Sequence, residues 1–129
     1  MSDLTECAVT KVATVTGIDA TAVATTLLYT VPAGKTFIPD HVVIRVTAFT
    51  ADGKDTQAVA SFGGNAATYD DFLNSVTYTV AAADVWIRDS VDDSALAVQA
   101  TGDEFKISIE IGSNAATETW AVDLFGYLI

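Results

Sequence analysis

Side chains suited to nucleophilic or metal chemistry are scarce in this sequence. It holds one histidine, His41, and one cysteine, Cys7. A serine or cysteine nucleophile needs a neighbouring base, so any such arrangement would have to recruit His41. That residue follows Pro39 and Asp40 without a recognisable catalytic motif, and we expect it at an edge or on the surface. Zinc needs three or four nitrogen or sulfur ligands. We therefore expect no zinc site, no cofactor and no enzymatic activity.

Carboxylates are the other groups that could do chemistry. Asp89, Asp92 and Asp93 lie in a polar segment over 89–94, and oxygen ligands crowded on a loop can hold Ca²⁺. The segment lacks the glycine and the distal glutamate of an EF-hand loop. A solvated acidic loop is therefore the simpler interpretation, and Ca²⁺ binding stays an open alternative.

Asp70 and Asp71 form a second acidic pair. The two acids of a glycosidase must face each other across a cleft, whereas adjacent residues of a helix do not face each other. Thr68 can cap a helix, and apolar residues follow at helical spacing. We expect one short helix near 69–75, with both acids in its first turn, where the helix dipole favours negative charge. The glycine-rich stretch over 63–67 lacks the lysine of a P-loop and is interpreted as a strand-to-helix turn.

The charge balance bears on possible partners. Seventeen acidic and 6 basic residues give a formal net charge of −11. A negative field of this size repels phosphate backbones and anionic lipid headgroups, so we expect neither nucleic-acid nor membrane binding. Residues 1–6 lack the basic and apolar regions of a signal peptide. We expect synthesis in a cytoplasm.

The elements that would position these groups are β-strands. The 129 residues fit one domain, and period-two alternation of apolar and polar residues is the main pattern. It is clearest over 104–111, where Phe105, Ile107, Ile109 and Ile111 share one face. Further faces of this kind are Val42-Ile44-Val46-Ala48, Val23-Thr25-Leu27-Tyr29-Val31, Val76-Tyr78-Val80, Leu96-Val98-Ala100, Trp120-Val122-Leu124 and the shorter Ala58-Ala60-Phe62.

Turn residues separate these alternating stretches. Candidate turns lie over 32–35, 52–54, 101–103 and 112–114, and the last three are interpreted as hairpin connections. Pro39 falls inside a strand-like stretch, which predicts an edge or a bulge there. About eight strands and one short helix match an antiparallel β-sandwich or a barrel. We assign the sandwich to residues 21–129, and residues 1–20 to an N-terminal arm or a peripheral strand outside the core.

Some apolar side chains fall on the predicted outer faces. Trp86 alternates out of phase with Val85 and Ile87, so it either anchors an interface or binds sugar, or else packs under the 89–94 loop. Phe125, Tyr127 and Ile129 lie opposite Trp120, Val122 and Leu124 on the last strand. A strand that is apolar on both faces indicates burial on both sides, by the fold or by a neighbouring subunit. The candidate interface residues are therefore Trp86, Phe125, Tyr127 and Ile129.

Several short stretches resemble small structural proteins of tailed bacteriophages. They are LLYTVPAGKTF over 27–37, leading into a strand over 41–49, the glycine-rich turn before YDDF over 69–72, and the ending LFGYLI over 124–129. The resemblance extends in order over 23–129. It implies a jelly-roll β-sandwich that decorates or cements a capsid, often as a homotrimer, or that forms part of a fibre or tail.

Together these observations lead to one expected function and one alternative. We expect a non-catalytic protein of the phage virion, on the outer surface of the head, that bridges capsomers as a homo-oligomer, with a trimer favoured. Its partners would be itself and the major capsid protein, contacted through the N-terminal arm and the outer residues of the last strand. The alternative is a module of a head or tail fibre that binds host glycan through Trp86 and loop carboxylates.

Overall fold

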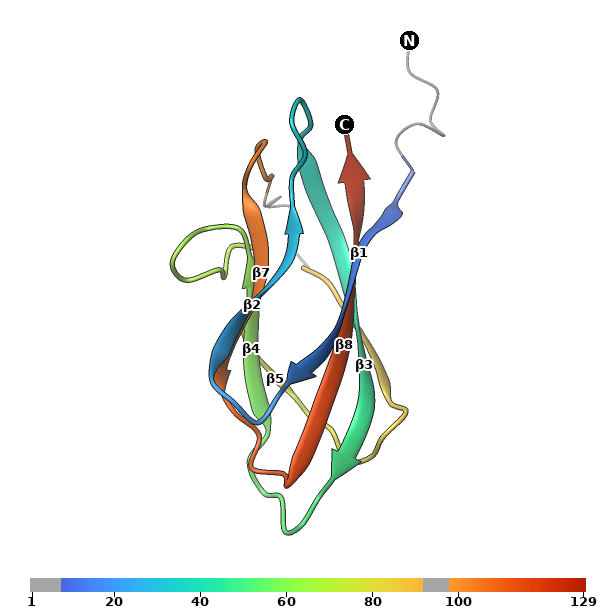
Figure 1. Ribbon diagram of the computed structural model, residues 1–129, viewed down its shortest axis with the longest axis vertical. Coiled ribbons are helices and arrows are strands. Elements are labelled where there is room, and N and C mark those ends of the chain that lie inside the picture. Colours follow the sequence, from blue (N-terminus) through green and yellow to red (C-terminus); the bar gives the residue numbers. More distant parts are fainter. Residues whose placement is uncertain (1–7, 92–97) are drawn as a thin grey trace.

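The computed structural model describes residues 8–91 and 98–129, and every regular element within these ranges is a β-strand. Figure 1 shows the strands arranged in two layers. In chain order they are β1 (Thr10–Asp19), β2 (Ala24–Thr30), β3 (Phe37–Thr50), β4 (Ala58–Gly63), β5 (Leu73–Tyr78), β6 (Trp86–Asp89), β7 (Glu104–Ile111) and β8 (Thr117–Leu128).

The strand order is that of a jelly roll. Each strand pairs with the one at the mirrored position in the chain: β1 with β8, β2 with β7, β3 with β6 and β4 with β5. Pairing of β3 with β8 and of β4 with β7 completes two antiparallel sheets. We call the sheet β1-β8-β3-β6 sheet A and the sheet β2-β7-β4-β5 sheet B. A long hairpin wrapped upon itself gives this order, so the expected β-sandwich is confirmed.

The core lies between the two sheets and is built from the alternating faces. The buried residues of the three longest alternations are Val42, Ile44 and Val46 of β3, Phe105, Ile107 and Ile109 of β7, and Trp120, Val122 and Leu124 of β8. Aromatic rings meet edge to face between the sheets, as where the Tyr78 and Trp120 ring centroids lie 5.7 Å apart. Contacts of this geometry add roughly 0.5–1.5 kcal/mol each beyond their buried area.

The alternation predicted for β2 is wrong along its first half. Leu28 is buried there, whereas Val23 and Leu27 are exposed. The pairing of β2 with β7 shifts register between Leu27 and Tyr29. This bulge inverts the phase, because one inserted residue moves the following side chains to the opposite face. Only Tyr29 and Val31 keep the inward orientation that the pattern predicted.

Three further residues predicted on inner faces lie outside the core: Ile111, Val98 and Ala100. Ile111 is exposed at the end of β7, just beyond a register shift in the pairing of β7 with β4. Val98 is also exposed, and the neighbouring Gln99 is buried in its place. Gln99 forms an isolated bridge with Phe37 rather than part of a named strand, while Leu96, predicted on the same face, lies outside the described residues.

The short helix expected near 69–75 is wrong. Residues 64–72 form a loop, and Leu73 already begins β5. Asn65 organises this loop, because its Oδ1 accepts hydrogen bonds from the backbone nitrogens of Asp70 (2.7 Å) and Asp71 (3.0 Å). Tyr69 has a φ of 50°, which a right-handed helix does not contain. A side-chain acceptor therefore replaces the backbone acceptors that a helix would have supplied.

The predicted turns are present, but three of them were given the wrong role. Lys35 N donates to Pro32 O (3.1 Å), and Gly34 has the positive φ of 75° that a type II turn requires. The turns over 52–54, 101–103 and 112–114, interpreted as hairpin connections, instead lie in connections that carry the chain from one sheet to the other. The bulge predicted at Pro39 is confirmed by a register shift between Pro39 and His41.

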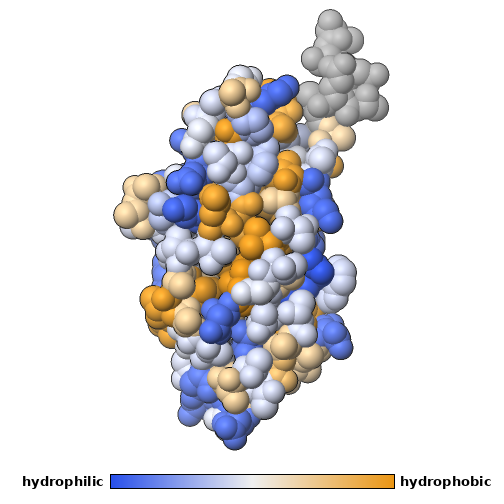
Figure 2. Space-filling view, in the orientation of Figure 1, coloured by the Kyte–Doolittle hydropathy of each residue, from blue (hydrophilic) through white to orange (hydrophobic). Residues whose placement is uncertain are grey.

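β1 and β2 are the edge strands on one side of the sandwich, and they contact each other. Figure 2 shows an apolar strip along the middle of this side. The segment that the sequence assigned to an arm or peripheral strand contributes to the core, because Ile18 and Ala20 are buried. Two register shifts interrupt the pairing of β1 with β8, and such bulges protect an exposed edge from pairing with other chains.

Candidate interaction surface on the outer face of sheet A

The side chains of sheet A that alternate with the core residues form a continuous outer surface. We call it the outer face of sheet A. Strand pairing assigns it Lys11 and Thr14 of β1, Ala121, Asp123, Phe125 and Tyr127 of β8, Ile38, His41, Val43 and Arg45 of β3, and Trp86 and Arg88 of β6.

A chain of contacts crosses all four strands of this face. Arg45 donates to Asp123 through Nε (3.0 Å to Oδ2) and Nη2 (3.1 Å to Oδ1). Thr14 Oγ1 donates to Asp123 Oδ1 at 2.7 Å. On its other side, the Arg45 guanidinium carbon lies 5.7 Å from the centre of the Trp86 ring. A two-pronged contact of this kind fixes the guanidinium, so Arg45 is held in place beside the indole.

Trp86 lies at the exposed end of this chain of contacts. It is 69% exposed, while its neighbours Val85 and Ile87 pack against the core. The ring therefore lies on the outer face of the sheet, whereas residues 92–94 of the 89–94 loop lie outside the described residues. A large, ordered, solvent-exposed indole is the kind of group that anchors protein interfaces.

His41 occupies the same face farther along β3. Its ring stacks on Phe125 at 4.4 Å between centroids, with an interplanar angle of 10°. Its Nδ1 lies 2.7 Å from Asp40 Oδ2, and its side chain is only 14% exposed. The expected edge position is wrong, because β3 is an inner strand of the sheet; the ring does lie on an outer surface, where Phe125 covers one of its sides.

The four interface residues predicted from the sequence lie at two ends of this elongated surface. Trp86 is paired with Arg45, whereas Phe125 is paired with His41, about 13 Å away at the usual rise of a strand. Tyr127 continues the face beyond Phe125, and Ile129 lies past the end of β8, 54% exposed. Two backbone hydrogen bonds with Thr36, at 2.8 and 3.0 Å, hold Ile129 beside the start of β3.

The outer face of sheet A differs in charge from the rest of the chain. It carries three of the 6 basic residues, Lys11, Arg45 and Arg88, against three acids, Asp19, Asp40 and Asp123. The chain as a whole has a net charge of −11, so this face, on which the formal charges balance, is less negative than the rest of the protein. No sequence pattern indicated it, because its basic residues are far apart in the chain and are brought together only by the strand order.

The acidic segments have structural roles in the described part of the chain. Asp89 accepts a hydrogen bond from Tyr78 Oη (2.9 Å); burial, together with this carboxylate, raises the pKa of Tyr78. Asp92 and Asp93 lie outside the described residues. Within residues 8–91 and 98–129, no three His, Cys, Asp or Glu side chains gather closely enough to hold a metal ion.

Asp70 and Asp71 hold the loop over 64–72 together. The Asn65 and Thr68 side chains donate to Asp70 and lower its pKa. Asp71 Oδ1 accepts from Gly64 N at 2.9 Å. The glycine-rich stretch thus leads into a strand-to-strand loop, and the strand-to-helix assignment is wrong.

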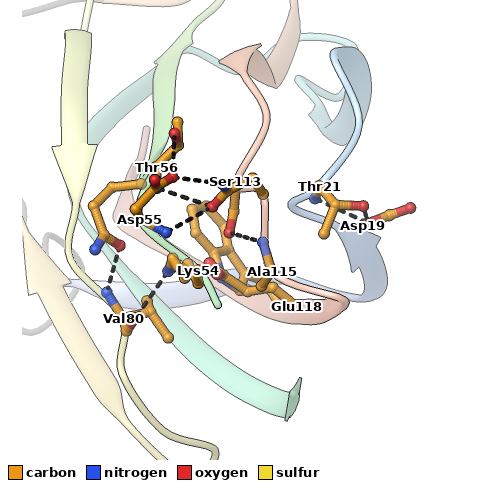
Figure 3. A network of polar contacts seen from close by, with 12 residues as sticks. Asp19, Thr21, Lys54, Asp55, Thr56, Val80, Ser113, Ala115 and Glu118 are labelled. Carbon is orange, nitrogen blue, oxygen red and sulfur yellow. Dashed lines mark hydrogen bonds and ion pairs between the residues drawn. The ribbon is translucent and has the colours of Figure 1, made fainter. Parts of the chain in front are cut away.

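Sequence reasoning missed a buried ion pair at one end of the core (Figure 3). Lys54 Nζ lies 2.8 Å from Glu118 Oε1, with the two side chains 4% and 0% exposed. Lys54 also donates to Val80 O (2.8 Å), and Trp120 Nε1 donates to Glu118 Oε2 (3.0 Å). One signal was available, because Glu118 alternates in phase with the inward-facing Trp120, and an acid on a core face requires a partner.

The described residues include no helix long and apolar enough to cross a membrane. Comparisons of the chain with protein-family models, with curated proteins and with solved structures found no match.

Proposed function

We propose that this chain is a non-catalytic structural protein of a tailed-phage virion that decorates or cements the outer surface of the head. The observation that carries the proposal is the outer face of sheet A, where an ordered, exposed Trp86 and half-buried aromatic residues lie among cationic side chains. Its partners in this role are further copies of itself and the major capsid protein.

The composition of this face supports a role in protein assembly. Trp, Tyr and Arg dominate the energetics of protein interfaces, especially where they are held in place before binding. Here Arg45 is fixed by Asp123 and lies over Trp86, while Phe125 is stacked on His41. Little side-chain freedom remains to be lost on association, which lowers the entropic cost of forming a contact.

The mechanism would be mechanical. A typical stable interface buries about 800 Å² of each partner, and this chain exposes 6540 Å², so one such contact uses roughly an eighth of its surface. An oligomer lying across a capsomer junction adds this buried area between subunits that the shell alone does not link. The acidic remainder of the surface stays in solvent and opposes aggregation of particles.

The sequence resemblance supports placing this role in a phage. The stretch over 27–37, which resembles phage structural proteins, spans the end of β2, the turn over 32–35 and the first residue of β3. The similar ending over 124–129 supplies Phe125 and Tyr127 to the outer face of sheet A. Two of the stretches that carry the resemblance therefore pair with each other, since Phe37 lies opposite Leu128.

The proposal is tested by adding the purified full chain to expanded capsids that lack it and sedimenting the particles. We expect saturable co-sedimentation at a fixed number of copies per capsid. Trp86→Ala should weaken it, whereas Val23→Ala, which alters an equally exposed residue outside this face, should not. A chain that leaves capsids unoccupied at high concentration would exclude the decoration role.

The exposure of Trp86 also favours a second candidate, a fibre module that binds host glycan. An indole that is 69% exposed, with Arg45 beside it, offers a flat platform for a sugar ring and a hydrogen-bond donor at its rim. This candidate predicts retention of the chain on immobilised host polysaccharide. Retention should be lost in Trp86→Ala and kept in part by Trp86→Tyr; no retention of the unaltered chain rules the candidate out.

A further inference from the structure

We propose that two copies of this chain associate through the outer face of sheet A about a two-fold axis, so that Trp86 of each copy packs on Phe125 and Tyr127 of the other. The inference rests on the self-association in the proposed function and names the surface and the symmetry that carry it. It also departs from the trimer that the resemblance implies.

Electrostatics select this surface for contact between copies. Two chains that each have a net charge of −11 repel one another. The repulsion is smallest when they meet through a surface whose local charge is not negative. On the outer face of sheet A three acids are balanced by three cations, and Arg45 is already paired with Asp123. Two such faces therefore meet with little net charge between them.

The outer face of sheet B does not meet this condition. Glu104 and Glu110 alternate with the core residues of β7, with Lys106 between them. Lys106 lies 4.8 Å from the Tyr69 ring, which places the loop bearing Asp70 against this face as well. Acids outnumber cations here, so contact of two such faces would be repulsive at low salt.

The shape of the face decides the symmetry. Its aromatic groups form two clusters, Trp86 at one end and Phe125 with Tyr127 at the other, on a single sheet surface. Clusters that face the same way can meet only when two copies stack face to face. A two-fold axis in the plane between the two copies then places Trp86 of each copy on Phe125 and Tyr127 of the other. Every contact is therefore made twice. A three-fold ring would need two surfaces inclined to each other.

The test measures the mass and the dissociation constant of the purified full chain by light scattering and sedimentation equilibrium. We expect a dimer. Trp86→Ala should raise its dissociation constant by about 30-fold or more, as for the central residue of an interface. Val23→Ala should leave it unchanged. Dissociation that is unaffected by Trp86→Ala would overturn the proposal.

A matched pair of charge reversals locates the face independently. Arg88→Glu and Lys106→Glu each change the net charge from −11 to −13 (−11 − 2), but only Arg88 lies on the outer face of sheet A. We expect Arg88→Glu to weaken the dimer by more than tenfold beyond the effect of Lys106→Glu. Equal weakening would show that net charge alone matters, and would contradict the proposed surface.

Cross-linking tests the symmetry. A photoreactive residue in place of Trp86 should capture the partner's β8, within 119–128, in the dimer. Capture of β7, or a trimeric mass, would overturn the two-fold arrangement. This outcome is separate from capsid binding. A dimer that does not bind capsids would exclude the decoration role and support the two-fold contact. A trimer bound to capsids would support the decoration role and exclude the two-fold contact.

Discussion

Replacing Lys54 with methionine will leave the carboxylate of Glu118 buried without its cation. The two side chains are 4% and 0% exposed, and Nζ lies 2.8 Å from Oε1. Lys54 also satisfies the carbonyl of Val80 at 2.8 Å, so the substitution removes two contacts from one cluster. Trp120 Nε1, at 3.0 Å from Oε2, remains as a donor to the carboxylate.

The expected loss follows from this burial. Removing one partner of a buried ion pair destabilises a protein by about 3–5 kcal/mol, because the remaining charge is uncompensated. Total stabilities of single domains are about 5–15 kcal/mol, so Lys54→Met should remove a large fraction of the free energy of unfolding. For a chain of this length the midpoint of thermal unfolding should fall by about 10–20 °C.

The assay is urea unfolding followed by circular dichroism, with two control variants. Lys35→Met, at an exposed turn lysine, should change the free energy of unfolding by less than about 0.5 kcal/mol. The double variant Lys54→Met with Glu118→Gln should recover much of the loss, since no buried charge remains. If Lys54→Met is as stable as Lys35→Met, or if the double variant is no better than the single one, the reasoning about this pair is wrong.

Three further predictions concern titration and packing. The raised pKa of Tyr78 means that the unfolded state loses its phenol proton first, so the contribution of Tyr78 to stability should be complete below pH 10 and fall as the pH rises above 10. Tyr78→Phe should make the free energy of unfolding decline less steeply with alkaline pH. An equally steep decline in the variant would contradict this prediction. Asn65→Ala should raise the pKa of Asp70 toward its ordinary 3.8, because the substitution removes the hydrogen bond that lowers this pKa most. Carbon-detected NMR titration measures the pKa of Asp70, and an unchanged pKa would argue against the role of Asn65. Gly126→Ala should lower the free energy of unfolding by about 1–3 kcal/mol, because the added Cβ would clash with the backbone oxygen of Ile38. Thermal unfolding like that of the unaltered chain would refute the close packing.

The fold was predictable from the sequence where apolar and polar side chains alternate strictly between the two faces of a strand. The faces through Phe105 and Ile107 and through Trp120 and Val122 were placed correctly, because regular pairing keeps the two-residue period intact. The inward and outward sides of β2 were predicted incorrectly along its first half, because the bulge between Leu27 and Tyr29 depends on pairing with β7, a strand far along the chain. Local sequence carries no information about that partner.

The helix near 69–75 shows a different limit. Its apolar spacing was real, but Asn65 offers the backbone of Asp70 and Asp71 a competing acceptor. Hydrogen bonds from a side chain to nearby backbone compete with helix formation, and a propensity argument does not register them. The same stretch therefore satisfied a helical pattern and folded as a loop.

The sequence identified the aromatic residues of the candidate surface, but not their arrangement or the charges around them. Trp86, Phe125 and Tyr127 were identified because each is apolar on a predicted outer face. Their arrangement at two ends of one face, and the cations around them, depend on the order β1-β8-β3-β6. Lys11, Arg45 and Arg88 come from three different strands, so only the topology could reveal that they gather on one face and balance its acids.

Electron cryo-microscopy of phage particles that contain this chain tests the central claim most directly. The account predicts density for the eight-stranded sandwich on the outside of the head, at junctions between capsomers, with the outer face of sheet A covered by a second copy. Density for the sandwich in a tail fibre, or copies on the head with Trp86 exposed to solvent, would contradict it.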